Sequence, residues 1–187
     1  MTAIRSIAIA TAASTLFMAL ACSTAQAQSV SLDPIALTVG KGESFSMTLR
    51  AEDFALAVLG GGFGLSFDPG VLRLDSVVIP ASWEFAKSGG LIDNASGTLS
   101  DAYFSTNVPV PGDVTLATLY FTALNPGESL VTPLPNTLQP FVEDGALEAT
   151  VPTYQFATVT VAVPEPGALA LMLAGGLALA RLRSRRS

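Results

Sequence analysis

Apolar and polar residues alternate with a period of two through the middle of the chain. In the segment Ser44–Arg50, the apolar side chains Phe45, Met47 and Leu49 fall on one face, and hydroxyl or charged side chains fall on the other. The segment Gly62–Phe67 repeats this pattern, with glycine and serine on its second face. Because successive side chains of a β-strand point to opposite sides, a period of two predicts strands with one dry and one wet face.

Turn signals rich in proline, glycine and acidic residues separate these strands from others. Further strands are predicted at 71–78, 98–104, 114–123 and 155–163. No window between residues 28 and 163 keeps a helical apolar period over three turns. The pattern predicts an all-β domain, an antiparallel β-sandwich or barrel. Seven prolines between Pro109 and Pro152 predict long loops or edge segments there, since proline cannot donate to a central ladder.

The first 27 residues have the features of a secretory signal peptide. Arg5 supplies a positive start, and Ile7–Ala21 is an apolar run interrupted only by threonine and serine. Ala25 and Ala27 place small side chains beside the expected scissile bond, so cleavage after Ala27 leaves Gln28 as the new N-terminus. A first transmembrane helix is the alternative, but the apolar run is short and ends at a cleavage site.

The only cysteine, Cys22, lies within this segment. A lipoprotein would be cut before Cys22 and acylated on it, but that cleavage favours leucine three residues upstream, where this chain has Ala19. Cleavage after Ala27 instead leaves a mature protein without a thiol, and therefore without a disulfide or a cysteine-ligated metal.

Histidine is absent from the whole sequence. Its absence removes the commonest general base, the commonest metal ligand and every serine–histidine or cysteine–histidine triad. Residues 28–163 hold four basic and fourteen acidic residues, and the resulting net charge of −10 repels a phosphate backbone. We therefore predict no catalytic residues, no metal, no cofactor and no nucleic-acid partner.

Residues 164–187 differ in character from the middle of the chain. Gly167–Ala180 is apolar on every face, unlike a surface helix. The uncharged stretch 166–180 spans about 22 Å as a helix, against a hydrocarbon core of about 30 Å, so on length alone a buried helix competes. Arginine stems that snorkel lengthen the effective span, and we predict a transmembrane helix at 167–180 with a cytoplasmic basic end at 181–186. The arginines that orient it are Arg181, Arg183, Arg185 and Arg186.

The order of these C-terminal features resembles the PEP-CTERM sorting signal of Gram-negative bacteria. The matching parts are a Val-Pro-Glu-Pro box, a short apolar helix and an arginine-rich end. The resemblance implies recognition by an exosortase-type protease near the box, followed by release from the inner membrane to the cell surface or an extracellular matrix. A simple linker would show the same rigid, acidic motif outside a membrane anchor. The box consists of Val163, Pro164, Glu165 and Pro166.

The central domain, residues 28–163, resembles cohesin modules, which are relatives of the family-2 and family-3 carbohydrate-binding sandwiches. Four patches carry the resemblance: Ser31–Gly42, Glu43–Asp53, Leu59–Leu72 and Leu116–Ser129. The resemblance implies an antiparallel jelly-roll β-sandwich of nine strands that acts by binding rather than by catalysis. Cohesins present a sheet face to a dockerin, but no feature of this sequence implies a dockerin partner.

Trp83, the only tryptophan, and Tyr103 are the candidate ligand-binding residues. Tryptophan stacks on sugar rings or anchors protein interfaces, and it also fills cores. A planar sugar-binding face usually carries several such rings, whereas this chain has one tryptophan and three tyrosines. Phe63, Leu65 and Phe67 offer an aromatic strand face that is better explained as core.

Two groups of acidic residues suggest other chemistry. Asp93, Asn94 and Asp101 carry the oxygen ligands that calcium prefers, but they lack calcium-loop spacing and fit solvated turns better. Glu143 and Asp144 are adjacent, so their side chains point apart and cannot form the converging pair of a glycosidase.

Two functions from different classes remain for the exported domain. The first is a non-catalytic module that binds a polysaccharide or a protein at the surface or in the matrix. The second is a structural matrix or surface-layer component without a specific ligand. A glycosidase is a distant third, for the reasons above.

Overall fold

A computed structural model describes residues 27–163, and every regular element in that range is a β-strand. The predicted all-β class is therefore confirmed. The predicted signal peptide, the box from Pro164 onward and the predicted C-terminal helix lie outside the described residues. In chain order the strands are β1 Ser29–Asp33, β2 Ala36–Gly40, β3 Ser44–Glu52, β4 Val58–Ser66, β5 Leu72–Val78, β6 Ala86–Ser88, β7 Leu91–Asp93, β8 Thr98–Val110, β9 Val114–Ala123, β10 Gly127–Pro135, β11 Val142–Glu143, β12 Thr153–Tyr154 and β13 Ala157–Ala162.

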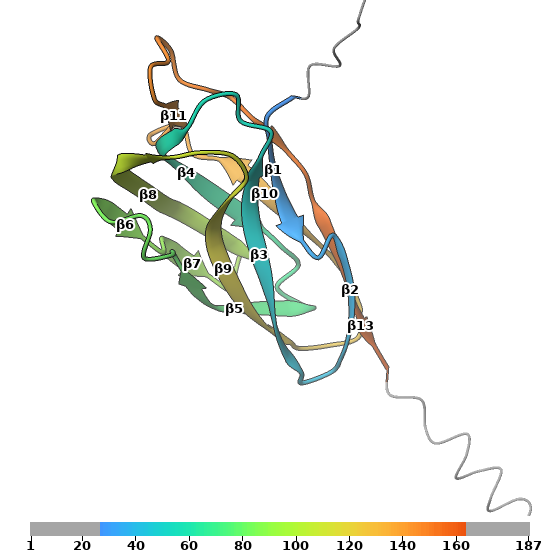
Figure 1. Ribbon diagram of the computed structural model, residues 1–187. Helices are drawn as coiled ribbons and strands as arrows, with labels where there is room; N and C mark the ends of the chain where they lie inside the picture. Colours follow the sequence, from blue (N-terminus) through green and yellow to red (C-terminus); the bar gives the residue numbers. More distant parts are fainter. Residues whose placement is uncertain (1–26, 164–187) are drawn as a thin grey trace, which may run out of the picture.

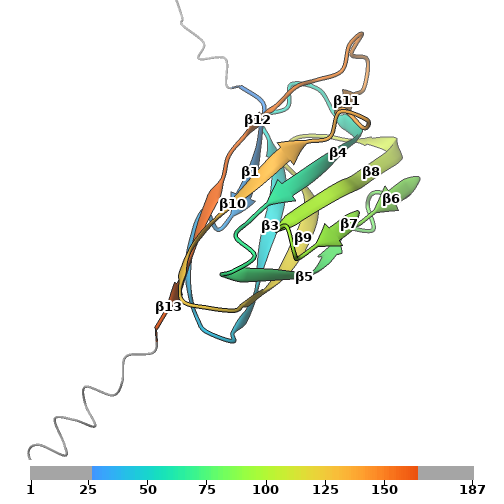
Figure 2. The same cartoon turned by 180° about the vertical axis from the view of Figure 1, so that it is seen from behind.

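The strands form two facing sheets. A five-stranded sheet has the order β12-β1-β3-β9-β5 and lies toward the viewer in Figure 1. An eight-stranded sheet has the order β2-β13-β10-β4-β8-β6, with β11 on β4 and β7 on β8, and Figure 2 shows it from the other side. Sheets stacked in this way bury their inner faces against each other, which is the architecture of a β-sandwich.

Two strand pairs are parallel, although the sequence predicted an antiparallel sandwich. β1 pairs with β12, and β2 pairs with β13, both in parallel register, whereas the other pairs are antiparallel. In each case the chain leaves the five-stranded sheet and continues in the eight-stranded one. The segments 29–40 and 153–162 make this crossing side by side in the same direction, which is why both pairs are parallel.

The core lies between the sheets and follows the predicted alternation. Met47 and Leu49 of β3 are buried, and Phe63 and Leu65 of β4 face them with no exposed surface. Phe45 is only partly buried and packs on the rim of this core. Burial alternates along β3 and β13, as a period of two requires, whereas the glycine-rich strand β4 is buried on both faces.

The prolines near the end of β10 agree with the predicted edge segments and not with the alternative of long loops. Pro133 and Pro135 lie within a strand and pair with β4 opposite Leu65 and Phe63. The partner on the other side, β13, pairs with β10 only as far as Val131. The last part of β10 is thus an edge on that side, where the missing N–H of proline removes no ladder hydrogen bond.

Candidate functional site

Trp83 lies in the core and not on a surface. Its side chain has no exposed area, its ring centroid is 4.4 Å from that of Phe104, and its Nε1 donates to the carbonyl oxygen of Thr115 at 3.0 Å. The ring offers no free face to a ligand, so its position argues against the predicted ligand role. Tyr103, between buried Ala102 and Phe104, lies half-buried on the opposite face of β8. The two candidate ligand residues are therefore not brought together.

The acidic residues considered for calcium have structural partners. The Asp93 carboxylate accepts hydrogen bonds from the Ser96 hydroxyl at 2.8 Å and from the Ala95 N–H at 2.9 Å. These bonds, the hydroxyl first, hold the pKa of Asp93 below its ordinary value. The Asn94 amide binds both backbone groups of Leu74, while Asp101 is exposed on β8. Between residues 27 and 163, no three acidic, histidine or cysteine side chains gather as a metal site.

Glu143 and Asp144 diverge, as predicted. Glu143 is buried and accepts hydrogen bonds from other segments, whereas Asp144 is exposed. A carboxylate enclosed by its own protein cannot converge with a second one on a sugar bond. Neither residue therefore contributes to a glycosidase site.

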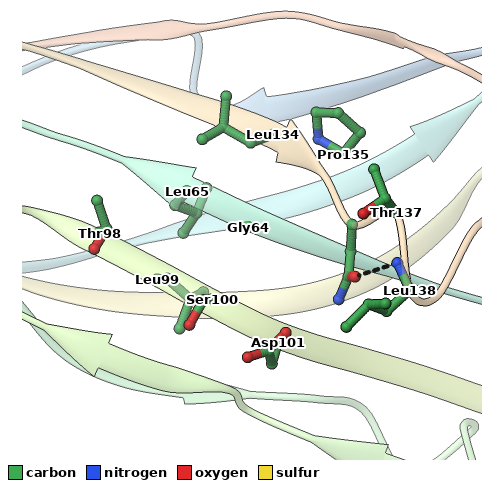
Figure 3. A pocket seen from close by; sticks show the side chains of 11 residues that line it. Gly64, Leu65, Thr98, Leu99, Ser100, Asp101, Leu134, Pro135, Thr137 and Leu138 are labelled. Atoms are coloured by element: carbon green, nitrogen blue, oxygen red, sulfur yellow. Dashed lines mark hydrogen bonds between the residues drawn. The ribbon is translucent and has the colours of Figure 1, made fainter.

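A groove of about 340 Å³ crosses the outer face of the eight-stranded sheet (Figure 3). Gly64 of β4 forms its floor, and the β8 residues Thr98–Asp101 form one wall. The opposite wall consists of Leu134 and Pro135 at the end of β10, followed by residues 136–138. We call this feature the sheet groove.

Glycine makes the groove possible because the strands on either side approach β4 closely. A Cβ atom at Gly64 would lie 2.9 Å from the carbonyl oxygen of Leu99 and 3.7 Å from Cβ of Leu134. A Cβ atom at Gly62 would lie 2.7 Å from Cβ of Gln139. These glycines were predicted to lie opposite Phe63 and Leu65, and the structure confirms it. Their clustering in the sequence is the signal from which a trough at this position can be predicted.

The rim of the sheet groove is apolar. Leu134 is 40% exposed and Leu138 is 78% exposed, and Leu130 continues the same exposed row along β10. The Leu138 N–H donates to Oδ1 of Asn136 at 3.0 Å, which holds the loop in a turn. The Nδ2 of Asn136 is buried and has no hydrogen-bond partner among the described residues. Exposed leucines beside a trough are the kind of surface that binds other proteins.

The charged side chain that lines the sheet groove is acidic. Asp101 belongs to its wall, and residues 88–163 contain seven acidic residues and no lysine or arginine. No basic side chain from this half of the domain therefore neutralises the groove. A ligand with basic groups complements this surface better than an anionic one.

The two facing sheets define this domain as a β-sandwich. No protein-family model matches the sequence, and no curated protein sequence does. Solved structures do match, all at low sequence identity, so they show the fold alone. The predicted cohesin-like fold is confirmed in this sense.

Three cohesins illustrate the match. The seventh type I cohesin of ScaB from Pseudobacteroides cellulosolvens is 13% identical, with a TM-score of 0.60 over 75% of this chain and 96% of that one. CaCohA2 from Clostridium acetobutylicum, solved in complex with a variant of CaDoc0917, is 15% identical with a TM-score of 0.58 over 72% and 99%. A non-cellulosomal cohesin from the archaeon Archaeoglobus fulgidus is 13% identical with a TM-score of 0.56 over 73% and 91%.

Proposed function

We propose that this chain is an exported, non-catalytic module whose β-sandwich binds a protein partner through the sheet groove. The observation that carries the proposal is the glycine-floored trough flanked by exposed Leu134 and Leu138. The fold supports it, since one matching cohesin was solved in a cohesin–dockerin complex from Clostridium thermocellum. A trough with a leucine rim accommodates the apolar face of a protein segment.

The partner segment is expected to be apolar and basic. The four basic side chains of residues 28–163 all have partners away from the groove. Arg50 is 3.5 Å from Glu52 and Arg73 is 2.7 Å from Asp75. Lys41 donates to Asn125 at 3.2 Å, and Lys87 donates to the Pro80 carbonyl at 3.1 Å. The remaining acidic excess attracts a cationic partner and raises its rate of association.

Polysaccharide binding has less support than protein binding. Among residues 27–163, the exposed aromatic rings are Phe85 before β6, Tyr120 in β9, and Phe156 between β12 and β13. They belong to separate elements and do not form a row along one strand. A structural role without any ligand is the remaining alternative, and the sheet groove is the feature that argues against it.

Export and sorting complete the proposal. A signal peptide cut between Ala27 and Gln28 delivers the domain across the inner membrane, where the helix 167–180 and its arginines hold it. An exosortase-type protease then acts at Val163–Pro166 and releases the domain to the cell surface or matrix. This is supported by the end of β13 at Ala162 and by the 64% exposure of Val163, the first residue of the box. Within residues 27–163, no helix meets the length and hydropathy required of a membrane span.

The test is capture of a binding protein from a cell-envelope extract with the exported full-length protein. Leu138→Asp, at the rim of the groove, should abolish capture. Leu147→Asp, a fully exposed leucine on another loop, should not. The captured protein, once purified, should bind directly, and raising the salt from about 0.1 M to about 1 M should weaken it.

Two results contradict the proposal. The first is a bound protein that both leucine variants retain equally. The second is retention of the domain by an extracted polysaccharide with no effect of Leu138→Asp.

For the sorting step, alanine replacement of Pro164, Glu165 and Pro166 should leave the exported protein at the inner membrane, which cell fractionation would detect. Equal release of the variant and the wild type would make the box a linker.

A further inference from the structure

The buried carboxylate of Glu143 connects three segments that are distant in the chain. Its exposed fraction is 4%. Oε1 accepts from Nε2 of Gln28 at 3.0 Å and from the Thr150 hydroxyl, and Oε2 accepts from the Leu56 N–H at 2.8 Å. A buried carboxylate is tolerated only when donors replace its water shell, so each of these donors matters.

Of these donors, Gln28 is the one that would become the first residue of the mature protein after signal-peptide cleavage. Its carbonyl oxygen accepts from the Thr153 N–H at 2.8 Å and from the Thr153 hydroxyl at 3.1 Å. Its side chain and its backbone are therefore both held, whereas Ala27 just before it is exposed. The boundary between exposed and held chain falls at the Ala27–Gln28 bond, which is also the bond predicted for signal-peptide cleavage.

An N-terminal glutamine has its own chemistry. The free α-amine attacks the side-chain Cδ, a five-membered lactam forms, and the bond from Cδ to Nε2 breaks. The amide nitrogen leaves as ammonia and carries away the proton that the amine loses. This reaction needs no oxidant or second substrate. It does require the side chain to fold back onto its own amine.

We propose that Gln28 is a cyclisation site that Glu143 holds in the open form once the signal peptide has been removed. The proposal rests on the cleavage step of the proposed function. The hydrogen bond from Nε2 to Glu143 keeps the side chain extended, and the two bonds from Thr153 fix the carbonyl. Cyclisation in the folded domain must first break the bond to Glu143, and it then removes that donor for good.

The coupling works in both directions. Folding slows loss of ammonia from Gln28, and loss of ammonia removes the hydrogen bond that ties the N-terminus to Glu143 of β11. Glu143 would keep Leu56 and Thr150 as donors, but its Oε1 would lose one of its two. Whether Gln28 is intact or cyclised therefore indicates whether its hydrogen bond to Glu143 can form in the folded domain.

The experiment follows the N-terminal peptide of the exported, processed protein by mass spectrometry during incubation. Loss of one ammonia marks the cyclised form. A free peptide with the sequence Gln28–Asp33 is the reference for an unheld glutamine. Cyclisation in the folded protein should be slower by at least about tenfold, the factor expected from one hydrogen bond to a charged acceptor.

Glu143→Ala should remove most of this protection, and Glu148→Ala is the matched control because Glu148 is exposed in the loop that follows β11. If Glu143→Ala fails to fold, comparison of the wild type with the free peptide still tests whether the folded domain slows cyclisation of Gln28. Equal rates for folded protein and peptide overturn the proposal, as does slower cyclisation in Glu143→Ala. A mature N-terminus other than Gln28 contradicts the cleavage step, whereas a rapidly cyclised Gln28 contradicts only the role of Glu143.

Discussion

The two outer faces of the sandwich share one type of backbone and differ in what their side chains leave free. On the five-stranded sheet, charged residues of β3 and β5 pair with near neighbours. Glu52 lies near Arg50 and accepts from Ser31 at 3.1 Å, and Asp75 accepts from Thr122 at 2.6 Å. The small side chains between them carry hydroxyl groups: Ser46, Thr48, Thr118 and Thr122. The charged side chains named here therefore have partners on the same sheet.

The outer face of the eight-stranded sheet is different. Gly64 contributes no side chain, Leu134 and Leu138 expose apolar surface, and the exposed carboxylate of Asp101 lies in the wall without a basic neighbour in residues 88–163. The groups that this face leaves without an internal partner are the ones that a ligand could contact. The two faces therefore differ in whether their charged side chains have partners within the domain, and not in strand geometry.

The largest effect should come from the residue that joins the sheets behind both faces. Trp83 packs on Phe104 of β8 and donates to Thr115 of β9. Trp83→Ala should lower the free energy of unfolding by about 3–5 kcal/mol, because it leaves a large cavity. Tyr120→Ala on the outer face should cost less than about 1 kcal/mol. Urea unfolding followed by fluorescence or circular dichroism measures both, and similar losses would contradict this view of the core.

A methyl group in the sheet groove should have the next largest effect. Gly64→Ala places a Cβ atom 2.9 Å from the Leu99 carbonyl, so β4 and β8 must move apart. We expect a loss of about 1–3 kcal/mol in the free energy of unfolding. Ser46→Ala, on the outer face of the other sheet, should stay within about 0.5 kcal/mol. Equal unfolding midpoints for the two variants would show that the groove floor does not require glycine.

Asn94 tests how the edge of the five-stranded sheet is protected. Its amide donates to the Leu74 carbonyl at 3.0 Å and accepts from the Leu74 N–H at 2.9 Å, as a neighbouring strand would. Asn94→Ala should cost about 1–2 kcal/mol through these two lost bonds. It should also promote association through the open edge of β5, detectable by light scattering. The exposed Asn107→Ala is the control, and a monomeric, fully stable Asn94→Ala would disprove the edge-capping role.

The smallest effect should come from the ion pair between Arg73 and Asp75. Both side chains are partly exposed, so solvent screens their attraction. Arg73→Ala should change the free energy of unfolding by less than about 0.5 kcal/mol, and added salt should make little difference. A loss above about 1 kcal/mol in urea titration would mean that charges on this face stabilise the fold and do not only balance each other.

Local patterns predicted the strands with clear alternation and missed those without it. The segment from Ser44 onward became β3 and the segment Val114–Ala123 became β9, as expected. β10 was missed because Pro133 and Pro135 argue against a strand unless one edge is known to be open. The position of Trp83 was not predictable, since the same residue type serves cores and binding surfaces.

Composition and short-range patterns were enough to predict the all-β class, the acidic charge of the domain, the absence of histidine chemistry and the order of the C-terminal motif. These properties follow from composition and from the spacing of apolar residues along short segments, so they do not depend on which strands pair. Only the tertiary structure decided that β10 and its following loop lie across the glycines of β4, that Trp83 is enclosed, and that Glu143 receives Gln28, 115 residues away. Each depends on which strands pair across long stretches of chain, and burial of a side chain is a consequence of that pairing.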